Sequence, residues 1–367
     1  MTTMMSNVAV VTMLPHLKDY FTDTQNIEFL SRLMLTFPSL AIALLAPFLG
    51  HLIFKVGRHK SAIVGLLFFA IFGSAGLYLQ TMDLLLFSRF LLGITIAILM
   101  IVSTSLVGDY FHGEARHKFM GLQNAFIALG GVFFVVGGGI LSDIYWRYPF
   151  LIYLIGFILI PFVVKFLHKN PTIVHEETEE NLNSNLFGIY FLAFLLMLVF
   201  YILPTQIPFL IINHFGASGT ITGGVIALAF VSNALGALMF SKLKRRFPFS
   251  IIYIIGMAII GVGFILIGLV PEVIYFFLIA PVLGFGGGIL MTNITAWMLS
   301  RAHHTKRIKS SGYLTSSLFL GQFFSPIVFH PVVSYFGVQH FFIVVGVSLI
   351  LFIWLILLKK RFRTSLL

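Results

Sequence analysis

The stretch that decides the fold is Gly50-His51-Leu52-Ile53-Phe54-Lys55-Val56-Gly57-Arg58-His59-Lys60. It joins two apolar runs, residues 30–54 and 61–79, and each run is long enough to cross a bilayer as a helix of about 20 residues. Two glycines allow the backbone to turn sharply there and to pack closely. Because cytoplasmic loops carry an excess of Lys and Arg, the three cations place this stretch on the cytoplasmic side. The stretch therefore predicts a very short turn at a membrane surface.

The composition is that of an integral membrane protein. The 367 residues are 59% hydrophobic and 10% charged, with a mean hydropathy of +1.03. A soluble domain has about 45–50% apolar and about 25% charged residues. With no cysteine, the chain can form no disulfide or thiolate metal site. The net charge of +11 comes in short clusters between apolar runs, which favours anchoring at the inner leaflet over nucleic-acid binding.

Length and breaker residues divide the chain into apolar segments that predict twelve transmembrane helices. The first segment is short for a hydrocarbon core of roughly 30 Å, so we expect helix 1 to be truncated or incompletely inserted. No cleavable signal peptide is expected, since this segment leads directly into Pro15 and charged residues. The segments are 1–17, 30–54, 61–79, 84–107, 119–141, 150–166, 186–203, 222–240, 248–269, 274–299, 312–333 and 341–358.

An internal repeat divides the chain into two parallel halves. Gly121, Leu129, Gly130 and Phe150 recur at a constant offset as Gly312, Leu320, Gly321 and Phe341, and Gly50 to Lys60 resembles Gly236 to Arg246. We therefore predict a six-helix half over residues 1–166, a linker over 167–185, and a second six-helix half with a basic tail over 186–367. The acidic run in the linker favours a solvated connection, with a regulatory contact as the alternative.

The Lys and Arg distribution predicts the orientation. Of the 23 Lys and Arg residues, all but Lys18, Arg32, Arg89 and Arg147 fall in loops on one side of the predicted helices or in the C-terminal tail. This bias places the C-terminus in the cytoplasm. The expected location is the cell membrane, a bacterial inner membrane, with multiple passes.

The pattern Gly50-x-Leu52-x-x-x-x-Gly57-Arg58-x-Lys60 resembles the loop 2–3 signature of the major facilitator superfamily. The family usually has an aspartate where this chain has Phe54. The resemblance covers essentially the whole chain and implies alternating access at a site between two halves. It also implies that Arg58 pairs with Asp109 to close the cytoplasmic side of an outward-facing state. The alternative is that both are unpaired interfacial charges.

Three further stretches resemble the drug:proton antiporter branch of this family. Arg89-x-x-x-Gly93 resembles a motif whose arginine is thought to help proton coupling, with Leu92 in place of the usual glutamine. The alternative for Arg89 is snorkelling to water or bonding to backbone carbonyls. Trp146-Arg147-Tyr148-Pro149-Phe150 resembles the stretch that opens helix 6 in many efflux members.

The third stretch is the glycine-rich segment 119–141, which predicts a helix that packs closely against its neighbours. Of the branch's Gly-Pro-x-x-Gly-Gly motif only Gly138-Gly139 match, and Phe134-Val135 occupy the Gly-Pro positions. The glycines expected at the packing face are Gly130, Gly131, Gly137, Gly138 and Gly139.

Polar residues inside apolar helices are candidates to line a substrate cavity, because each must find a partner or water in the bilayer. Hydrogen bonding between helices is the alternative for each of them. Pro204 and Pro208 are expected to break helix 7 around such groups. The abundant phenylalanine, 42 residues, favours an apolar or amphipathic substrate over a sugar. The candidates are Asn7, Gln123, Asn124, Tyr201, Thr205, Gln206, Asn233, Asn293 and Gln322.

The sequence thus favours a secondary transporter, an exporter driven by a proton gradient, without cofactor, metal or enzymatic activity. No Asp or Glu lies deep in a predicted helix, and His16, Asp19 and His330 are the titratable groups near helix ends. A small-molecule substrate, protons and the lipid bilayer are the expected partners of a monomer. An importer of the same fold, or a sensor or inactive relic, is the alternative.

Overall fold

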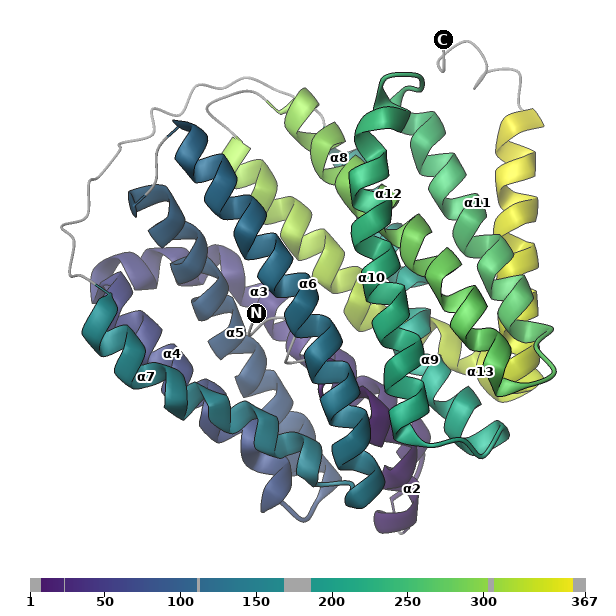
Figure 1. The fold of residues 1–367 in the computed structure, drawn as a ribbon, viewed down its shortest axis with the longest axis horizontal. Coiled ribbons are helices and arrows are strands. Elements are labelled where there is room, and N and C mark those ends of the chain that lie inside the picture. The colour runs from purple at the N-terminus through teal and green to yellow at the C-terminus, as the bar shows by residue number, and fades with distance from the viewer. Residues whose placement is uncertain (1–7, 23, 111–112, 168–185, 303–306, 359–367) are drawn as a thin grey trace.

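The computed structural model describes residues 8–22, 24–110, 113–167, 186–302 and 307–358, and these residues are helical with no strand among them (Figure 1). The first half holds η1 (Val11–His16), α2 (Leu17–Tyr20), α3 (Ile27–Val56), α4 (Arg58–Gly73), η2 (Ser74–Leu77), α5 (Met82–Tyr110), α6 (Gly113–Ile144), η3 (Tyr148–Leu154) and α7 (Ile155–Phe166). The second half holds α8 (Phe187–Phe200), α9 (Ile202–Pro208), η4 (Phe209–His214), α10 (Gly219–Lys244), α11 (Phe249–Gly268), η5 (Val273–Tyr275), α12 (Phe276–Arg301) and α13 (Arg307–Leu358).

In the described part of the chain, nine helices are long and apolar enough to cross a membrane. The number of described spans differs from the twelve predicted segments at three places. The last two segments form the continuous α13, in which Gly337 has a φ of 72° and marks a kink between them. The helix α6 is itself 32 residues long and contains the whole predicted segment 119–141, but within the described residues only Leu129–Ile144 counts as its apolar part. The described part of the first segment forms only η1 and α2.

The interruption predicted in helix 7 is present, but the segment is longer than residues 186–203. Pro204 and Pro208 lie in α9, which follows α8 after Tyr201, and the π-helical turn η4 extends the segment to His214. A proline supplies no backbone N–H and clashes with the preceding turn, so it interrupts a regular α-helix. The boundary between the halves stays a prediction, since most of the predicted linker lies outside the described residues.

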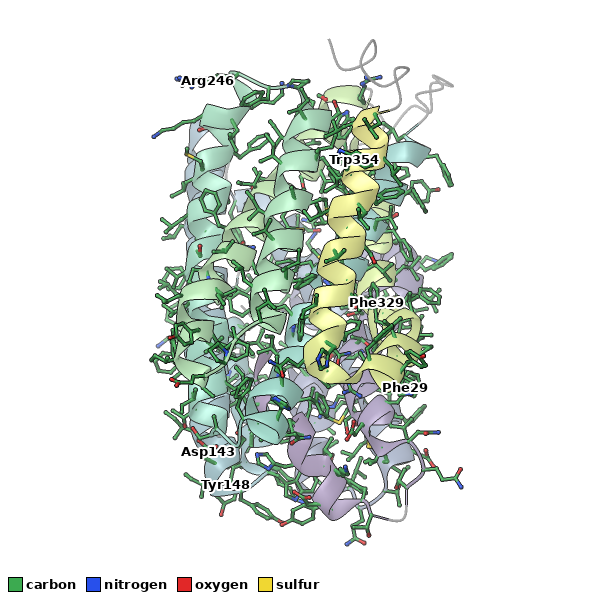
Figure 2. All side chains as sticks on the ribbon, turned by 90° about the vertical axis from the view of Figure 1, so that its right-hand side faces the viewer. Phe29, Asp143, Tyr148, Arg246, Phe329 and Trp354 are labelled. Carbon is green, nitrogen blue, oxygen red and sulfur yellow. The ribbon has the colours of Figure 1, made fainter. Side chains whose placement is uncertain are left out.

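The two ends of the molecule differ in chemistry. Figure 2 shows Arg246 and Trp354 at one end and Asp143 and Tyr148 at the other. We call the first the basic end, because the α10–α11 turn there carries exposed arginines, Arg245 and Arg246. We call the other the aromatic end, because Tyr20, Tyr145 and Trp146 pack there in edge-on or tilted pairs with ring centroids 4.9 to 6.3 Å apart.

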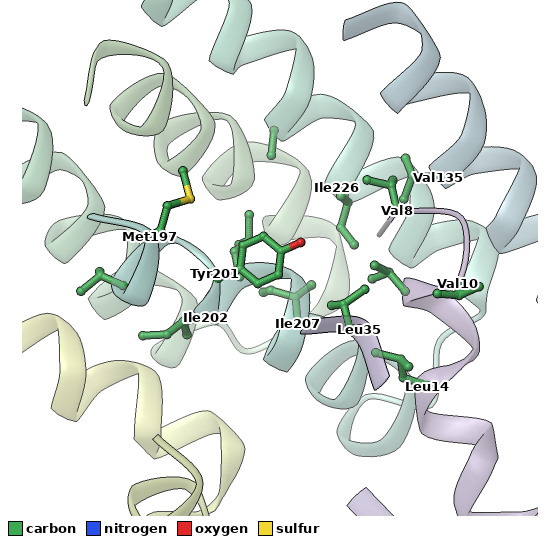
Figure 3. Close-up of a cluster of buried hydrophobic side chains, with 14 of the residues drawn as sticks. Val8, Val10, Leu14, Leu35, Val135, Met197, Tyr201, Ile202, Ile207 and Ile226 are labelled. Atoms are coloured by element: carbon green, nitrogen blue, oxygen red, sulfur yellow. The ribbon is translucent and has the colours of Figure 1, made fainter. Parts of the chain in front are cut away.

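The halves meet along two seams, one between α6 and α10 and the other between α3 and the pair α13 and α9. In Figure 1, α6 and α10 lie close together toward the aromatic end and diverge toward the basic end. Buried apolar side chains from both halves fill the space between η1, α3, α9 and α10 (Figure 3). Leu14, Leu35, Ile202 and Ile207 are at most 1% exposed there. The apolar core thus joins the halves nearer their aromatic end.

Candidate functional site

A buried arginine crosses between the halves. Arg32, in the second turn of α3, is 1% exposed and donates from Nε to Oε1 of Gln206 in α9 at 3.0 Å. Its Cζ lies 4.1 Å from the centre of the Phe209 ring, within the range of a cation–π contact. Glu28, one turn earlier on α3, lies 3.7 Å from Nη2 and has a 40% exposed side chain. The helical spacing places this carboxylate beside the guanidinium and partly neutralises a charge that would be costly to bury alone.

A second polar contact lies two turns further along α3. Ser39 donates from Oγ to Oε1 of Gln322 in α13 at 2.9 Å, and the Gln322 amide nitrogen is 3.5 Å from the Met197 sulfur. Phe37 and Phe323 meet beside it with ring centroids 5.9 Å apart. Polar groups between apolar helices must bond to each other or to water. This part of the seam therefore holds both hydrogen-bonding and aromatic side chains.

His330 of α13 lies close to the Arg32 cluster. Its ring centroid is 4.6 Å from that of Phe29, the residue after Glu28. Its Nδ1 is buried and has no hydrogen-bond partner among the described atoms. The sequence places His330 at a helix end, where a histidine is usually solvated, but the structure holds it within the seam. A titratable ring, a carboxylate and a guanidinium thus lie together where the halves meet.

Four of the predicted cavity residues lie at or beside this seam. Gln206 bonds to Arg32 and Gln322 bonds to Ser39, while Tyr201 and Thr205 are buried in the adjoining turns. The Thr205 hydroxyl donates to the Tyr201 carbonyl at 2.8 Å, which also accepts the Thr205 backbone N–H at 3.3 Å. The predicted break of helix 7 around Thr205 and Gln206 is present, whereas the cavity-lining role of these four residues stays a prediction.

Other cavity candidates lie elsewhere. Asn293 is fully buried inside the second half and donates from Nδ2 to the Phe249 carbonyl at 3.0 Å, so it joins α12 to α11. Asn233 is half-buried in α10, and its backbone carbonyl faces Gly288 of α12. Asn7 lies outside the described residues, as do the side chains of Gln123 and Asn124. For Asn293 the structure shows the helix-to-helix hydrogen bond that was the alternative role.

Arg89 of α5 lies within the first half, away from the seam. It is fully buried and donates from Nη2 to the Gly73 carbonyl at 2.9 Å. Its Cζ lies 4.8 Å from the centre of the Phe150 ring and 5.3 Å from that of Tyr153. These contacts correspond to the backbone-bonded alternative. They join α5 to α4 and η3, because the guanidinium satisfies a carbonyl left free at the end of α4.

The turn between α3 and α4 is a single residue, Gly57, with φ 90° and ψ 141°. Residues with a side chain rarely adopt this conformation, so the prediction that glycine permits a sharp turn is confirmed here. Gly50 does not turn the chain, since it lies inside α3, and a methyl group added to it would meet no atom within 4 Å. Lys60 is exposed and Arg58 half-exposed. The side chain of Asp109 lies outside the described residues, so its pairing with Arg58 stays a prediction.

The glycines of α6 differ in what they touch. A methyl group on Gly138 would collide with the Ala9 carbonyl, and one on Gly139 would lie 2.5 Å from the Gly219 carbonyl of α10. Gly131 faces Phe230 at 3.8 Å, whereas Gly137 has nothing within 4 Å and Gly130 is buried. Close packing of this helix is therefore confirmed at Gly138 and Gly139, where the backbones approach too closely for a side chain.

Asp143, in the last turn of α6, crosses the other seam. Its carboxylate accepts hydrogen bonds from the Gly219 N–H at 2.6 Å and from the Thr220 N–H at 2.8 Å. These donors belong to the first turn of α10, where backbone N–H groups have no partner within the helix. The described residues contain no group of three His, Cys, Asp or Glu that could hold a metal ion.

Sequence reasoning missed Arg32, Ser39, Glu28 and Asp143 as site residues. Arg32 carried the same signal that singled out Arg89, a charge inside an apolar span. Glu28, one turn before it, was a further signal, since opposite charges four residues apart face each other on a helix. Nothing in the sequence pairs Asp143 with a segment more than 70 residues later, because that contact depends on how the halves dock.

Comparison with known proteins identifies the family. The model of the Major Facilitator Superfamily matches residues 1–247 and again residues 189–365. The chain belongs to the major facilitator superfamily. Two matches that together cover nearly the whole chain agree with an internally repeated architecture.

Two curated relatives come from Bacillus subtilis (strain 168). "Multidrug resistance protein 1" is 28% identical over 226 residues, which are 56% of this chain and 55% of that protein. "Multidrug resistance protein 2" is 29% identical over 169 residues, which are 42% of this chain and 41% of that protein. The chain thus spans about half the length of the curated relatives that it matches.

Solved structures share the fold at low sequence identity. A bacterial homologue of the human lysosomal transporter Spinster, in an inward-facing and occupied conformation, aligns with a TM-score of 0.78 and 16% identity over 98% of this chain and 94% of that one. A POT family transporter in complex with a thioalcohol-conjugated peptide aligns with a TM-score of 0.72 and 15% identity over the same shares. These similarities establish the two-half helical fold.

Proposed function

We propose that this protein is a secondary transporter that exports a small amphipathic solute through alternating opening of the seam between its halves. The observation that carries the proposal is the buried polar contact of Arg32 with Gln206, supported by that of Ser39 with Gln322. Buried polar groups between two halves have a use if the halves separate and expose them to a ligand, and this family binds its substrates between the halves.

Export is favoured over import by the two multidrug resistance relatives, although each is matched over only about half of its length. The phenylalanine pair Phe37 and Phe323 beside Ser39 and Gln322 suits a ligand with an apolar body and a polar group. We propose that the protein lies in a cell membrane with its basic end facing the cytoplasm, because Lys and Arg accumulate on that side. The protein is proposed to act as a monomer.

The proposed driving force is the proton gradient. Glu28, Arg32 and His330 form a cluster of titratable and charged groups at the seam, and a proton bound there changes the charge that must be buried when the halves close. A carboxylate and an imidazole change charge with pH, whereas the guanidinium stays cationic. In this proposal the cluster takes the role of an acidic residue deep in a membrane helix, which the predicted helices lack.

The test is transport by purified protein in proteoliposomes with an imposed pH gradient and a panel of lipophilic cations and neutral amphipathic dyes. We expect gradient-dependent movement of at least one compound. Arg32→Gln and Gln206→Ala should each reduce it by at least about tenfold, since each leaves a buried polar group without its partner at a cost of about 1–3 kcal/mol. Asn293→Ala is the matched control, because it removes a buried polar residue that lies away from the seam.

Binding of these compounds without any movement, by folded protein, would favour the sensor or relic. Counterflow that moves a compound inward would identify an importer. Equal losses for Arg32→Gln and Asn293→Ala would remove the seam from the proposal, since both would then report only general stability.

A further inference from the structure

The second seam carries a polar contact that closes the aromatic end. Besides the two backbone N–H groups, the Asp143 carboxylate accepts the Thr220 hydroxyl at 2.5 Å. All three donors lie on the first two residues of α10 in the second half, and the acceptor lies in the last turn of α6 in the first half. A carboxylate at a helix N-terminus is favoured by the unpaired N–H groups and by the positive end of the helix dipole.

The helix α10 does not need Asp143 to begin. Ser218 is its N-cap, and the Ser218 hydroxyl oxygen accepts from the Ile221 N–H at 3.2 Å. A serine in this position already provides the usual N-terminal cap. The N–H groups of Gly219 and Thr220 remain for Asp143. The contact therefore joins the two halves, whereas the start of the helix is stabilised locally.

The packing at this point leaves room for the carboxylate and little else. A methyl group on Gly219 would lie 2.9 Å from Oδ1 of Asp143 and would collide with the Ser142 hydroxyl. The nearby cation, Arg147, does not compete, because its Nη1 donates to the Gly76 and Leu79 carbonyls, each at 3.0 Å, and its Cζ lies 4.5 Å from the centre of the Trp146 ring. Gly219 thus leaves space for the Asp143 carboxylate, and Arg147 bonds to other groups, so that Asp143 contacts α10.

We propose that Asp143 is a latch that holds the aromatic end closed and must be released in every transport cycle. It is a positioning residue, acting on the equilibrium between states. The proposal rests on the proposed function, in that a transporter of alternating access has to open this end. Opening would separate α6 from α10 and break three hydrogen bonds together, while both helices keep their own backbone bonds. Asp143 is exposed to solvent at this end, so water can replace the lost bonds and the latch remains reversible.

The absence of cysteine from the chain makes the latch accessible to a direct test. Val135 is fully buried in α6, and its carbonyl faces Gly223 of α10. In Val135→Cys the single thiol should react slowly with a membrane-impermeant maleimide applied from the aromatic end. Adding Asp143→Ala should speed this labelling about tenfold, the change that corresponds to about 1.4 kcal/mol removed from the closed state. Thr220→Val, which removes one of the three bonds, should give a smaller increase.

The matched control is Asp83→Ala, which removes another acid, in the first turn of α5 at the same end. It should leave labelling of the Val135→Cys thiol unchanged. Equal labelling rates for the Asp143 and Asp83 variants would overturn the proposal. This measurement needs no substrate or gradient, so it can succeed or fail independently of the proposed export.

A second experiment links the latch to transport. In Asp143→Cys combined with Thr220→Cys, a short thiol-specific cross-linker should stop the transport that this double variant shows without it, and cleavage of the cross-linker should restore the rate of the untreated double variant. Each single cysteine variant treated in the same way is the control. Continued transport by fully cross-linked protein would show that this contact need not open, which would overturn the proposal.

Discussion

At the residue scale, the two buried arginines show how the same chemical group can serve different purposes. Arg32 bonds across the seam to Gln206, whereas Arg89 bonds inside one half to the Gly73 carbonyl. Both lie in apolar helices, where a charge is costly unless it is paired or hydrogen-bonded. Of the two arginines, only Arg32 makes a contact that would change in the proposed motion of the halves.

Arg89→Ala should therefore lower stability while leaving the pH dependence of transport unchanged. The substitution leaves the Gly73 carbonyl without its donor and empties the space beside Phe150, and it should cost about 2–4 kcal/mol. Thermal unfolding in detergent micelles, together with a pH profile of transport, measures both effects. A shifted pH profile at unchanged thermal stability would return Arg89 to the coupling role that its motif suggests.

Gly57 and Gly50 offer a matched pair for the turn that decides the fold. Gly57→Ala should destabilise the protein by about 1–2 kcal/mol, since its φ of 90° is disfavoured for any residue with a side chain. Gly50→Ala should be neutral or stabilising by about 0.5–1 kcal/mol, because Gly50 lies in the α3 helix with open space around it. Scanning calorimetry of the two variants gives the comparison, and equal effects would contradict this account of the turn.

At the element scale, α6 carries both packing glycines and Asp143, and so determines how closely the halves approach. Gly139 and Gly219 bring the backbones of α6 and α10 together at the aromatic end. Close approach of backbones through small residues is a main source of helix association in membranes. The helix would otherwise hold its neighbour at the wider spacing that side chains impose.

Gly139→Ala should weaken this approach, whereas Gly137→Ala should be tolerated. The added methyl group at position 139 would lie 2.5 Å from the Gly219 carbonyl, but at position 137 it would meet nothing within 4 Å. We expect a transport rate reduced by about tenfold or more for the first variant and nearly unchanged for the second, since overpacking typically costs about 1–3 kcal/mol. Transport by the two variants at equal protein content in vesicles would check this. Similar rates would show that the α6–α10 spacing does not limit turnover.

At the scale of the whole molecule, the halves are joined at the aromatic end by an apolar core and by polar contacts along both seams. Arg32 and Gln206 connect α3 to α9, and Asp143 connects α6 to α10. This arrangement leaves α6 and α10 apart at the basic end (Figure 1). Closing the basic end would require the aromatic end to open, if each half moves as a rigid body.

The orientation of the molecule can be tested with single cysteines. Arg246→Cys at the basic end should react with an impermeant thiol reagent only in inverted vesicles, and Tyr148→Cys at the aromatic end should react in intact cells. The physical reason is that basic loops are retained on the cytoplasmic side. The chain has no native cysteine that could add background labelling. The opposite pattern would overturn the proposed orientation, in which the basic end faces the cytoplasm.

The sequence by itself determined the membrane class, the order of the long helices, a short turn within residues 50–60 and the break in helix 7, whereas the structure assigned that turn to Gly57 alone. These features follow from local properties, namely the length of an apolar run, the freedom of a glycine and the missing N–H of a proline. The family resemblance through the loop at residues 50–60 rested on the same local pattern, and the family match confirms it.

Only the tertiary structure decided which polar residues meet. It joined Arg32 to Gln206 and Asp143 to Gly219, assigned Asn293 to the interior of one half, and held Arg89 away from the seam. A polar residue in an apolar helix must find a partner, but its sequence position does not say which helix will face it. That choice depends on how the helices rotate and on how the two halves dock.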